Sequence, residues 1–179
     1  MSDRGTSGPM PFKHAAHLLN PLRKLILSPS RLASRLSLNH DSSVLEVGPG
    51  PGYFSAEVAR NIPSGRLTLV DIQQEMLDMA KKRLDSFGLN NITYVQADAA
   101  ALPFAKETFN VVFLVAVLGE IPDKKKCIAE LHRVLCPGGL LSITEQPGDP
   151  DFIHVDEMKK LVGEMFFLEQ TFGSGRNYT

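Results

Sequence analysis

The sequence of 179 residues predicts an α/β fold, a doubly wound and mostly parallel sheet with helices on both faces. Two observations predict it. Short apolar runs alternate along the chain with amphipathic segments whose apolar residues recur at helical spacing. One run, "FNVVFLVAV" at residues 109–117, would be apolar on both faces of a strand, as the central strand of a parallel sheet must be.

Five of the apolar runs have the length of strands and are expected to form the sheet. They span residues 43–47, 67–71, 92–96, 109–115 and 140–144. Two of the intervening segments are predicted to be helices. Their apolar positions are Leu77, Ala80, Leu84 and Phe87 in the first, and Cys127, Leu131 and Leu135 in the second. Gly88 and Gly138 follow these helices as expected stop signals.

The two ends of the chain are predicted to add smaller elements. Asn20-Pro21 and Ser28-Pro29 each place an N-cap residue before a proline, which predicts two or three short helices ahead of the first strand. Residues 155–164 are expected to form one further helix. Residues 166–179 are expected to form a strand, a Gly-Ser-Gly turn and a returning strand, which would give a seven-stranded sheet whose last strand is short or truncated.

Composition and charge favour one globular domain of ordinary size. The chain is 43% apolar and 22% charged, and its net charge of -1 gives no reason to expect a polyanionic partner. No run approaches the roughly 20 apolar residues of a membrane span, and the N-terminus lacks the apolar core of a signal peptide. Cys127 and Cys136 are not spaced as metal ligands and fit a reduced chain. We therefore expect a cytoplasmic protein.

The stretch "VLEVGPGPGYF" at residues 44–54 alternates the most flexible residue type with the stiffest, directly after the first predicted strand. Glycines can adopt positive φ and let a ligand approach the backbone, whereas prolines fix φ and lower the entropy of the free loop. Ligands of doubly wound sheets bind beyond the carboxyl ends of the strands. The loop therefore predicts a rigid ligand shelf; taken alone, a tight turn without a ligand is the alternative.

Asp71 ends the second predicted strand, where a carboxylate can accept hydrogen bonds from two ribose hydroxyls. Both nicotinamide and S-adenosylmethionine binders use such an acid, so Asp71 does not separate them. The glycine spacing does separate them. A dinucleotide fingerprint requires G-x-G-x-x-G, and Tyr53 stands where its last glycine would fall. The observed G-x-G-x-G spacing therefore argues against a nicotinamide-dependent enzyme.

Four motifs, in order, make the chain resemble the Rossmann-like (class I) S-adenosylmethionine-dependent methyltransferases of the methyltransferase type 11 kind. The motifs are "LEVGPGPG" (45–52), "LVDIQQEML" (69–77), "VQADAAALPF" (95–104) and "HRVLCPGGLL" (132–141). The resemblance runs from about Val44 to Glu145 and more loosely to the end of the chain. The family often has Phe-Asp where this chain has Phe109-Asn110, a departure that bears on local structure more than on chemistry.

The resemblance implies that the chain binds S-adenosyl-L-methionine and releases S-adenosyl-L-homocysteine, with no metal ion. It places Asp71 at the ribose, Asp98 at the adenine amino group and the Ala99 N–H at a ring nitrogen. Glu46 would lie near the ammonium end of the cofactor. The expected cofactor-binding residues are Glu46, Gly48, Pro49, Gly50, Gly52, Tyr53, Asp71, Ile72, Asp98, Ala99 and Val115. For Tyr53 and Val115, a plain core role is the alternative.

The resemblance also implies methyl transfer by in-line displacement, in which the protein mainly positions the reactants and excludes water. A general base is needed only if the acceptor arrives protonated. Glu120 is the best candidate, because the segment after the fourth strand borders the methyl site in this family; a solvated carboxylate is the alternative. His17 and, beside it, His14 are candidates on the leading helix, and surface positions are the alternative.

Residues 1–40 are expected to form a flexible leader and a helical lid, and residues 41–179 the methyltransferase domain. From Arg4 to His40 the chain has six basic residues and no acidic one, beside many leucines. Many relatives carry a substrate cap after the fifth strand, which this chain lacks. The N-terminal helices would then cover the site and favour a hydrophobic or anionic acceptor, quinone-like or lipid-like, or a membrane surface. A packed helix with a solvated basic face is the alternative.

Three functions remain open from the sequence. The leading one is a methyltransferase that acts on a small molecule. A non-catalytic S-adenosylmethionine-binding module or subunit is the second, and a NAD-dependent oxidoreductase is a remote third. A nucleic-acid acceptor is not favoured, because the chain has no basic patch interleaved with aromatic residues. The sequence identifies neither the acceptor nor the oligomeric state.

Overall fold

A computed structural model describes residues 27–146, 150–174 and 177–179. Its centre is a sheet of five parallel strands, which confirms the predicted fold class. In chain order the strands are β1 (Ser43–Val47), β2 (Arg66–Asp71), β3 (Ile92–Gln96), β4 (Phe109–Val115) and β5 (Leu135–Thr144). The predicted bounds of β1, β3 and β4 are confirmed, and β2 begins one residue earlier than predicted.

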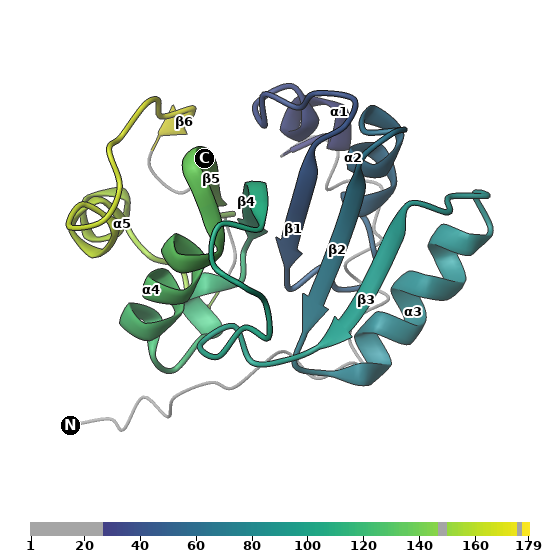
Figure 1. Ribbon diagram of the computed structural model, residues 1–179. Helices are drawn as coiled ribbons and strands as arrows, with labels where there is room; N and C mark the ends of the chain where they lie inside the picture. Colours follow the sequence, from purple (N-terminus) through teal and green to yellow (C-terminus); the bar gives the residue numbers. More distant parts are fainter. Residues whose placement is uncertain (1–26, 147–149, 175–176) are drawn as a thin grey trace.

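The strand order β3-β2-β1-β4-β5 reverses between β1 and β4. Val47 of β1 lies beside Val70 of β2 on one side and Leu114 of β4 on the other, and all neighbouring strands run parallel. The carboxyl ends of the strands therefore gather at one edge of the sheet, where the arrowheads of β1, β2 and β3 point downward in Figure 1. Doubly wound sheets bind ligands at this edge, beside the switch point.

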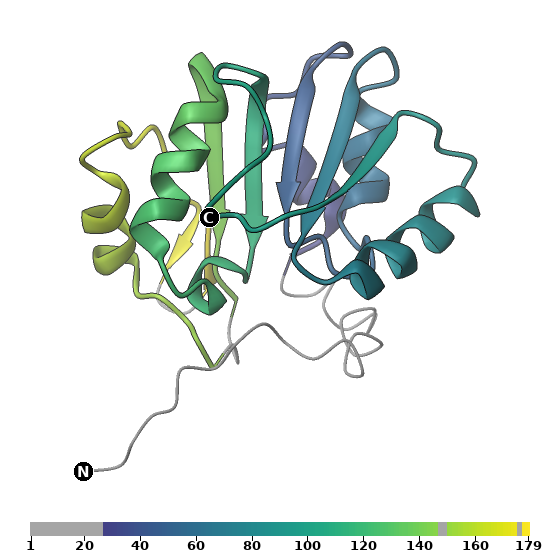
Figure 2. The same cartoon turned by 60° about the horizontal axis from the view of Figure 1, so that its bottom comes forward.

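Helices cover both faces of the sheet. They are α1 (Pro29–Ala33), α2 (Ser55–Asn61), α3 (Gln74–Asp85), the 3-10 helix η3 (Leu118–Glu120), α4 (Lys124–Val134) and α5 (Val155–Val162). One buried cluster joins α1, α2 and α3 to the sheet, and a second joins α4 and α5 to it. Val44 belongs to the first cluster and Leu45 to the second, because successive side chains of a strand point to opposite faces. In Figure 2, α4 lies in front of the sheet and α2 behind it.

The short helix α1 begins as its sequence predicts. The Ser28 side chain accepts a hydrogen bond from the Arg31 N–H at 3.2 Å, and Pro29 is the first helical residue. Three leucines of this segment are buried in the cluster that contains α2. They are Leu27, Leu32 and Leu36. This part of the expected lid is therefore core, whereas the cap at Asn20-Pro21 lies outside the described residues and the domain boundary at residue 40 stays a prediction.

The sequence predicts the two longest helices well. Gly88, at φ 70°, follows α3 and confirms the expected stop, although Phe87 lies past the helix and is largely exposed. Helix α4 ends at Val134, so Leu135 belongs to the next strand. Within the described part of the chain, no helix combines the length and the apolar character needed to cross a membrane.

The fifth strand starts earlier than the sequence predicts. Leu135 already pairs with Phe109, after which the register shifts and pairing resumes at Leu140 beside Val111. The prediction that Gly138 stops the preceding helix is wrong. Gly138 lies within this irregular stretch of β5, at φ 75°. The sequence of this stretch is typical of a turn. Its place in the sheet depends on pairing with β4, which is distant in the sequence.

The segment after α5 also differs from the prediction. Residues 166–172 form no strand, and Phe167 and Leu168 are exposed. A small antiparallel pair, β6 (Gly173–Ser174) with β7 (Asn177–Tyr178), stands where the turn and the returning strand are predicted. An isolated antiparallel bridge joins Tyr178 to Glu145. In the described residues, the main sheet therefore has five strands and not the predicted seven.

Candidate functional site

The glycine loop follows β1 and turns at the carboxyl edge of the sheet. Gly48, Gly50 and Gly52 have φ values of 66°, 52° and 75°, which lie in the region that favours glycine. The Gly48 N–H donates to the Val70 carbonyl at 2.8 Å, and the Gly52 N–H to the Pro49 carbonyl at 3.0 Å. The need for glycines in this turn is confirmed, and the loop is anchored to β2.

Gly48 also requires glycine for reasons of space. A Cβ at this position would lie 2.5 Å from Cγ2 and 2.8 Å from Cγ1 of Val117. Val117 follows Ala116, a non-glycine residue that adopts φ 54° directly after β4 and donates its N–H to the Thr144 carbonyl at 2.8 Å. The positive φ of Ala116 turns the chain after Val115 so that Val117 packs against Gly48. Sequence reasoning missed this backbone conformation.

Asp71 closes β2 with its carboxylate next to the glycine loop. Its Oδ1 accepts the Gln73 N–H at 3.0 Å, and the backbone N–H groups of Ile72 and Gly50 also donate to the carboxylate. Burial raises the pKa of Asp71, and these hydrogen bonds oppose the rise. Asp71 is therefore a fixed acceptor at the loop. The neighbouring Ile72 is 51% exposed and offers an apolar surface that a bound ring would cover.

Glu46 is in β1, two residues before Gly48 of the glycine loop. It is only 3% exposed, and its Oε2 accepts a hydrogen bond from the Ser55 hydroxyl at 2.6 Å. Burial raises the pKa of Glu46 to about 8 against the opposing effect of the Ser55 hydrogen bond, and the charge of Asp71 adds to the rise. Since Ser55 begins α2, this bond ties β1 to α2 across the loop. The expected contact of Glu46 with a cofactor ammonium group stays a prediction.

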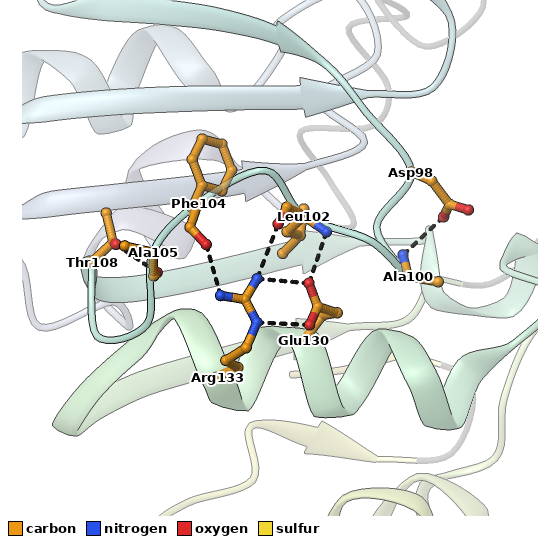
Figure 3. Close-up of polar contacts among 8 residues, drawn as sticks. All are labelled: Asp98, Ala100, Leu102, Phe104, Ala105, Thr108, Glu130 and Arg133. Atoms are coloured by element: carbon orange, nitrogen blue, oxygen red, sulfur yellow. Dashed lines mark hydrogen bonds and ion pairs between the residues drawn. The ribbon is translucent and has the colours of Figure 1, made fainter.

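Asp98 follows β3 at the same edge of the sheet. Its Oδ1 accepts the Ala100 N–H at 2.8 Å, and its side chain is exposed, whereas Ala99 is buried. The loop after Asp98 is held from α4 by Glu130 and Arg133, as Figure 3 shows. Sequence reasoning did not assign Glu130 and Arg133 to the site, because nothing in the sequence brings α4 to this loop.

Of the predicted catalytic residues, Glu120 and His17, Glu120 lies within the described residues. It ends η3 and is half-buried, and its N–H donates to the Val117 carbonyl at 3.1 Å. Because Val117 lies against Gly48, the backbone of Glu120 follows directly on the segment that borders the glycine loop. His14 and His17 lie outside the described residues, and their roles stay predictions.

Tyr53 lies in the apolar core. It is 7% exposed, and its ring meets the ring of Phe54 edge-on, with 4.8 Å between the centroids. This packing agrees with the core alternative, and contact with a cofactor stays a prediction. No group of three or more His, Cys, Asp or Glu side chains in the described ranges is arranged to hold a metal ion.

The predicted cofactor residues fall at one edge of the sheet. The glycine loop, Asp71, Asp98 and Val115 each lie at, or directly after, the carboxyl end of a parallel strand. Residues that follow these strand ends or support the loop are Glu46, Gly48, Pro49, Gly50, Gly52, Ile72 and Ala99. The arrangement offers positive-φ backbone, a fixed carboxylate and an exposed carboxylate on neighbouring strands, which suits a nucleoside ligand.

A groove of about 870 Å³ lies elsewhere, along the outer edge of β5. Its other wall comes from α5 and residues 165–172, and it contains none of the predicted cofactor residues. Because doubly wound sheets bind ligands at the carboxyl ends of their strands, the candidate site is the glycine loop and not this groove.

Comparison with known proteins agrees with this site. The family profile described as "Methyltransferase domain" matches residues 44–139. The chain is 39% identical over 105 residues to the ubiquinone/menaquinone biosynthesis C-methyltransferase UbiE of Klebsiella pneumoniae, a match that covers 58% of this chain and 42% of that protein. The protein of the same name from Pasteurella multocida is 40% identical over 104 residues, covering 57% of this chain and 39% of that protein. The matches thus span about two fifths of these relatives.

One solved structure has the same fold along most of the chain. A SAM-dependent methyltransferase from Aquifex aeolicus superposes with a TM-score of 0.86. The match covers 94% of this chain and 95% of that one at 20% sequence identity. At that identity the likeness concerns the fold, and it includes the segments on either side of residues 44–139.

Proposed function

The chain belongs to the methyltransferase domain family of class I S-adenosylmethionine-dependent enzymes, and we propose that it transfers a methyl group from S-adenosylmethionine to a small acceptor. One observation carries the proposal most strongly. The Gly50 N–H donates to the Asp71 carboxylate, so the acid expected at the ribose and the glycine loop expected to bind the cofactor form one unit. The matches cover only about two fifths of the length of these relatives. The activity of the whole chain is therefore part of the proposal.

We assign the cofactor contacts to residues that are fixed before binding. Asp71 would accept hydrogen bonds from the ribose hydroxyls, and Ile72 would pack on the adenine ring. Asp98 would accept from the adenine amino group while the Ala99 N–H donates to a ring nitrogen. When bound, S-adenosylmethionine supplies an electrophilic methyl group on a positively charged sulfur. The work left to the chain is to orient the acceptor and exclude water.

The acceptor we propose is a small hydrophobic or anionic molecule with a nucleophilic carbon. The name of the relatives, a C-methyltransferase of ubiquinone and menaquinone biosynthesis, supports a quinone-like acceptor, for which we propose a hydroxylated aromatic ring. The ring carbon of such an acceptor becomes more nucleophilic when its hydroxyl loses a proton. After this carbon gains the methyl group, it loses its own hydrogen as a proton to solvent, which restores the aromatic ring. Glu120 is the candidate base for the first step. A quinone-like ring could reach the protein from a membrane surface or from solution.

Ligand binding tests the proposed function. Isothermal titration of the protein with S-adenosylhomocysteine and with NAD should show binding of the first and none of the second. Mass-spectrometric screening of hydroxylated aromatic metabolites with S-adenosylmethionine should then reveal a product that is one methyl group heavier. Binding without transfer to any acceptor would favour the non-catalytic module. Binding of NAD alone would contradict the assignment.

Replacing Asp71 by alanine should weaken binding of S-adenosylhomocysteine about ten- to a hundredfold. The change removes a fixed acceptor and leaves ribose hydroxyls unpaired, at a cost of roughly 1.5–3 kcal/mol. Titration of the folded variant measures the effect. Asp85→Ala is the matched control, because Asp85 is an exposed acid paired with Lys81 at 2.8 Å on α3. Equal affinities of the two variants would show that the ribose is held elsewhere.

Removing residues 1–26 should leave cofactor affinity within about twofold and lower turnover more than about tenfold. The truncation stops at residue 26 because Leu27, Leu32 and Leu36 are buried in the core and removing them would unfold the chain. The cofactor residues all lie further along the chain, whereas the basic leader is the proposed cover of the acceptor. Turnover at the full-length rate would exclude the lid, and loss of cofactor binding in a folded variant would place the leader in the cofactor site.

A further inference from the structure

The loop between β3 and β4 has no helix or strand of its own over residues 97–108. Its backbone polar groups must therefore find partners outside regular structure. Several of them bond to two side chains of α4, Glu130 and Arg133, which Figure 3 shows directly below the loop. The loop begins one residue before Asp98, so these contacts bear on the predicted adenine site.

The Arg133 guanidinium donates four hydrogen bonds to described residues. Its Nε and Nη2 donate to Oε1 and Oε2 of Glu130, each at 2.7 Å. Its Nη1 donates to the Phe104 carbonyl at 2.7 Å, and its Nη2 also donates to the Leu102 carbonyl at 3.0 Å. The planar guanidinium thus joins a carboxylate on its own helix to two carbonyls of the loop, an arrangement that a lysine could not reproduce.

Glu130 contacts the loop from the other direction. Its Oε2 accepts the Leu102 N–H at 2.8 Å. Both backbone polar groups of Leu102 are therefore held by the pair, and the Leu102 side chain is buried. The hydrogen bond from Arg133 lowers the pKa of Glu130, with smaller help from the Leu102 N–H, so the acid stays charged. An exposed ion pair by itself would contribute little, but this pair fixes a segment of backbone.

The held residue is close to the predicted adenine contact. The Ala101 N–H donates to the Asp98 carbonyl at 2.9 Å, and the Ala100 N–H to Asp98 Oδ1 at 2.8 Å. Asp98, Ala100, Ala101 and Leu102 thus form one short chain of fixed contacts from the strand end to α4. The Asp98 side chain is exposed and its Oδ1 accepts the Ala100 N–H, so Oδ2 can serve as an acceptor for a ligand.

We propose that Glu130 and Arg133 are positioning residues that set the preference of the site for adenine. The proposal rests on the proposed function, because it needs a nucleoside at Asp98. By holding Leu102, the pair fixes the direction in which Asp98 presents its free oxygen and Ala99 its N–H. A hydrogen bond weakens steeply when its angle or length changes, so a loosened loop would bind the base with less discrimination.

The test compares two ligands that differ at the adenine amino group. S-inosylhomocysteine carries an oxygen where S-adenosylhomocysteine carries the amino group that Asp98 would accept from, and its adjacent ring nitrogen carries a hydrogen. The wild-type protein should bind the adenosine compound at least about tenfold more tightly, the effect of one lost charged hydrogen bond. Arg133→Met should reduce this ratio to about two, and Arg133→Lys should give a value between the two.

The control is Arg60→Met. Arg60 faces Glu57 at the same three-residue spacing on α2, 3.8 Å apart, and neither side chain hydrogen-bonds to loop backbone among the described residues. This variant should keep the wild-type ratio. If Arg133→Met does not fold, as judged by its thermal transition, Glu130→Gln replaces it, and its ratio should also fall.

The ratio separates positioning from general stability. A variant at Arg133 that loses affinity for both ligands equally, with an unchanged ratio, would overturn the inference, since the pair would then be only structural. A wild-type ratio near one would also overturn it. If the wild-type protein binds neither ligand, the proposed function itself fails, a result distinct from the other two.

Discussion

Gly48→Ala should destabilise the protein by about 2–5 kcal/mol and lower cofactor affinity more than about tenfold. Two costs add. A residue with a Cβ at positive φ costs roughly 1–2 kcal/mol, and overpacking costs about 1–3 kcal/mol. The second cost arises because the new Cβ would lie 2.5 Å from Val117 Cγ2, and a β-branched side chain cannot turn away easily. Urea denaturation and titration with S-adenosylhomocysteine measure the two effects.

Gly88→Ala provides the matched control. Gly88 has φ 70°, close to the 66° of Gly48, but a Cβ there would meet nothing within 4 Å. Its substitution should carry the backbone cost alone and leave cofactor binding unchanged. Adding Val117→Ala to Gly48→Ala should recover part of the stability but not the backbone part. If Gly48→Ala costs no more than Gly88→Ala, the contact with Val117 does not constrain the loop.

The fold was predictable where the signal lies within one short stretch of sequence. The apolar runs of β1 and β3 are bounded by polar or turn residues, and the limits predicted for β1, β3 and β4 agree with the structure. The start of β5 was not predictable in this way, because Leu135 is in the strand through its pairing with Phe109 and not through local pattern. Residues 166–172 have an apolar pattern typical of a strand but do not form one, since a strand needs a partner as well as a pattern.

The candidate site likewise contains features that local sequence predicts and features that depend on distant contacts. The glycine loop and Asp71 follow from the residue types themselves, because positive φ and a strand-ending carboxylate are local properties. The positive φ of Ala116 and the contact of Arg133 with the Leu102 carbonyl depend on the packing of distant segments. The burial of Glu46 against Ser55 also depends on the fold, and its expected role near the cofactor stays a prediction.

The burial of Glu46 should make the unfolding free energy of the unliganded protein depend on pH. The folded chain keeps the proton of Glu46 up to about pH 8, whereas the unfolded chain loses it near the ordinary value of 4.5. Between these values the folded state holds more protons than the unfolded state, so stability is greatest at the acidic end and falls as the pH rises. Above about pH 8, Glu46 is ionised in both states, and the unfolding free energy falls no further because of this group.

Glu46→Gln should remove most of this dependence. The amide cannot ionise, and its oxygen can still accept the Ser55 hydroxyl, so the variant should be more stable than wild type at pH 8.5 by about 5 kcal/mol, an order-of-magnitude value from the shift. At pH 5 the two proteins should differ little. Urea denaturation at a series of pH values between about 5 and 9 measures the effect, and Glu75→Gln, at an exposed position of α3, is the control.

Asp71 is the group that could produce a similar slope, because burial raises its pKa as well. The charges of the two acids interact, so their titrations are coupled, and single substitutions are needed to tell the two groups apart. If Glu46→Gln keeps the wild-type slope while Asp71→Asn removes it, the proton held by the folded chain belongs to Asp71. The ribose acceptor would then be protonated in the unliganded protein, and ribose binding, which needs the carboxylate, would release a proton that buffers of different ionisation enthalpy detect in the titration.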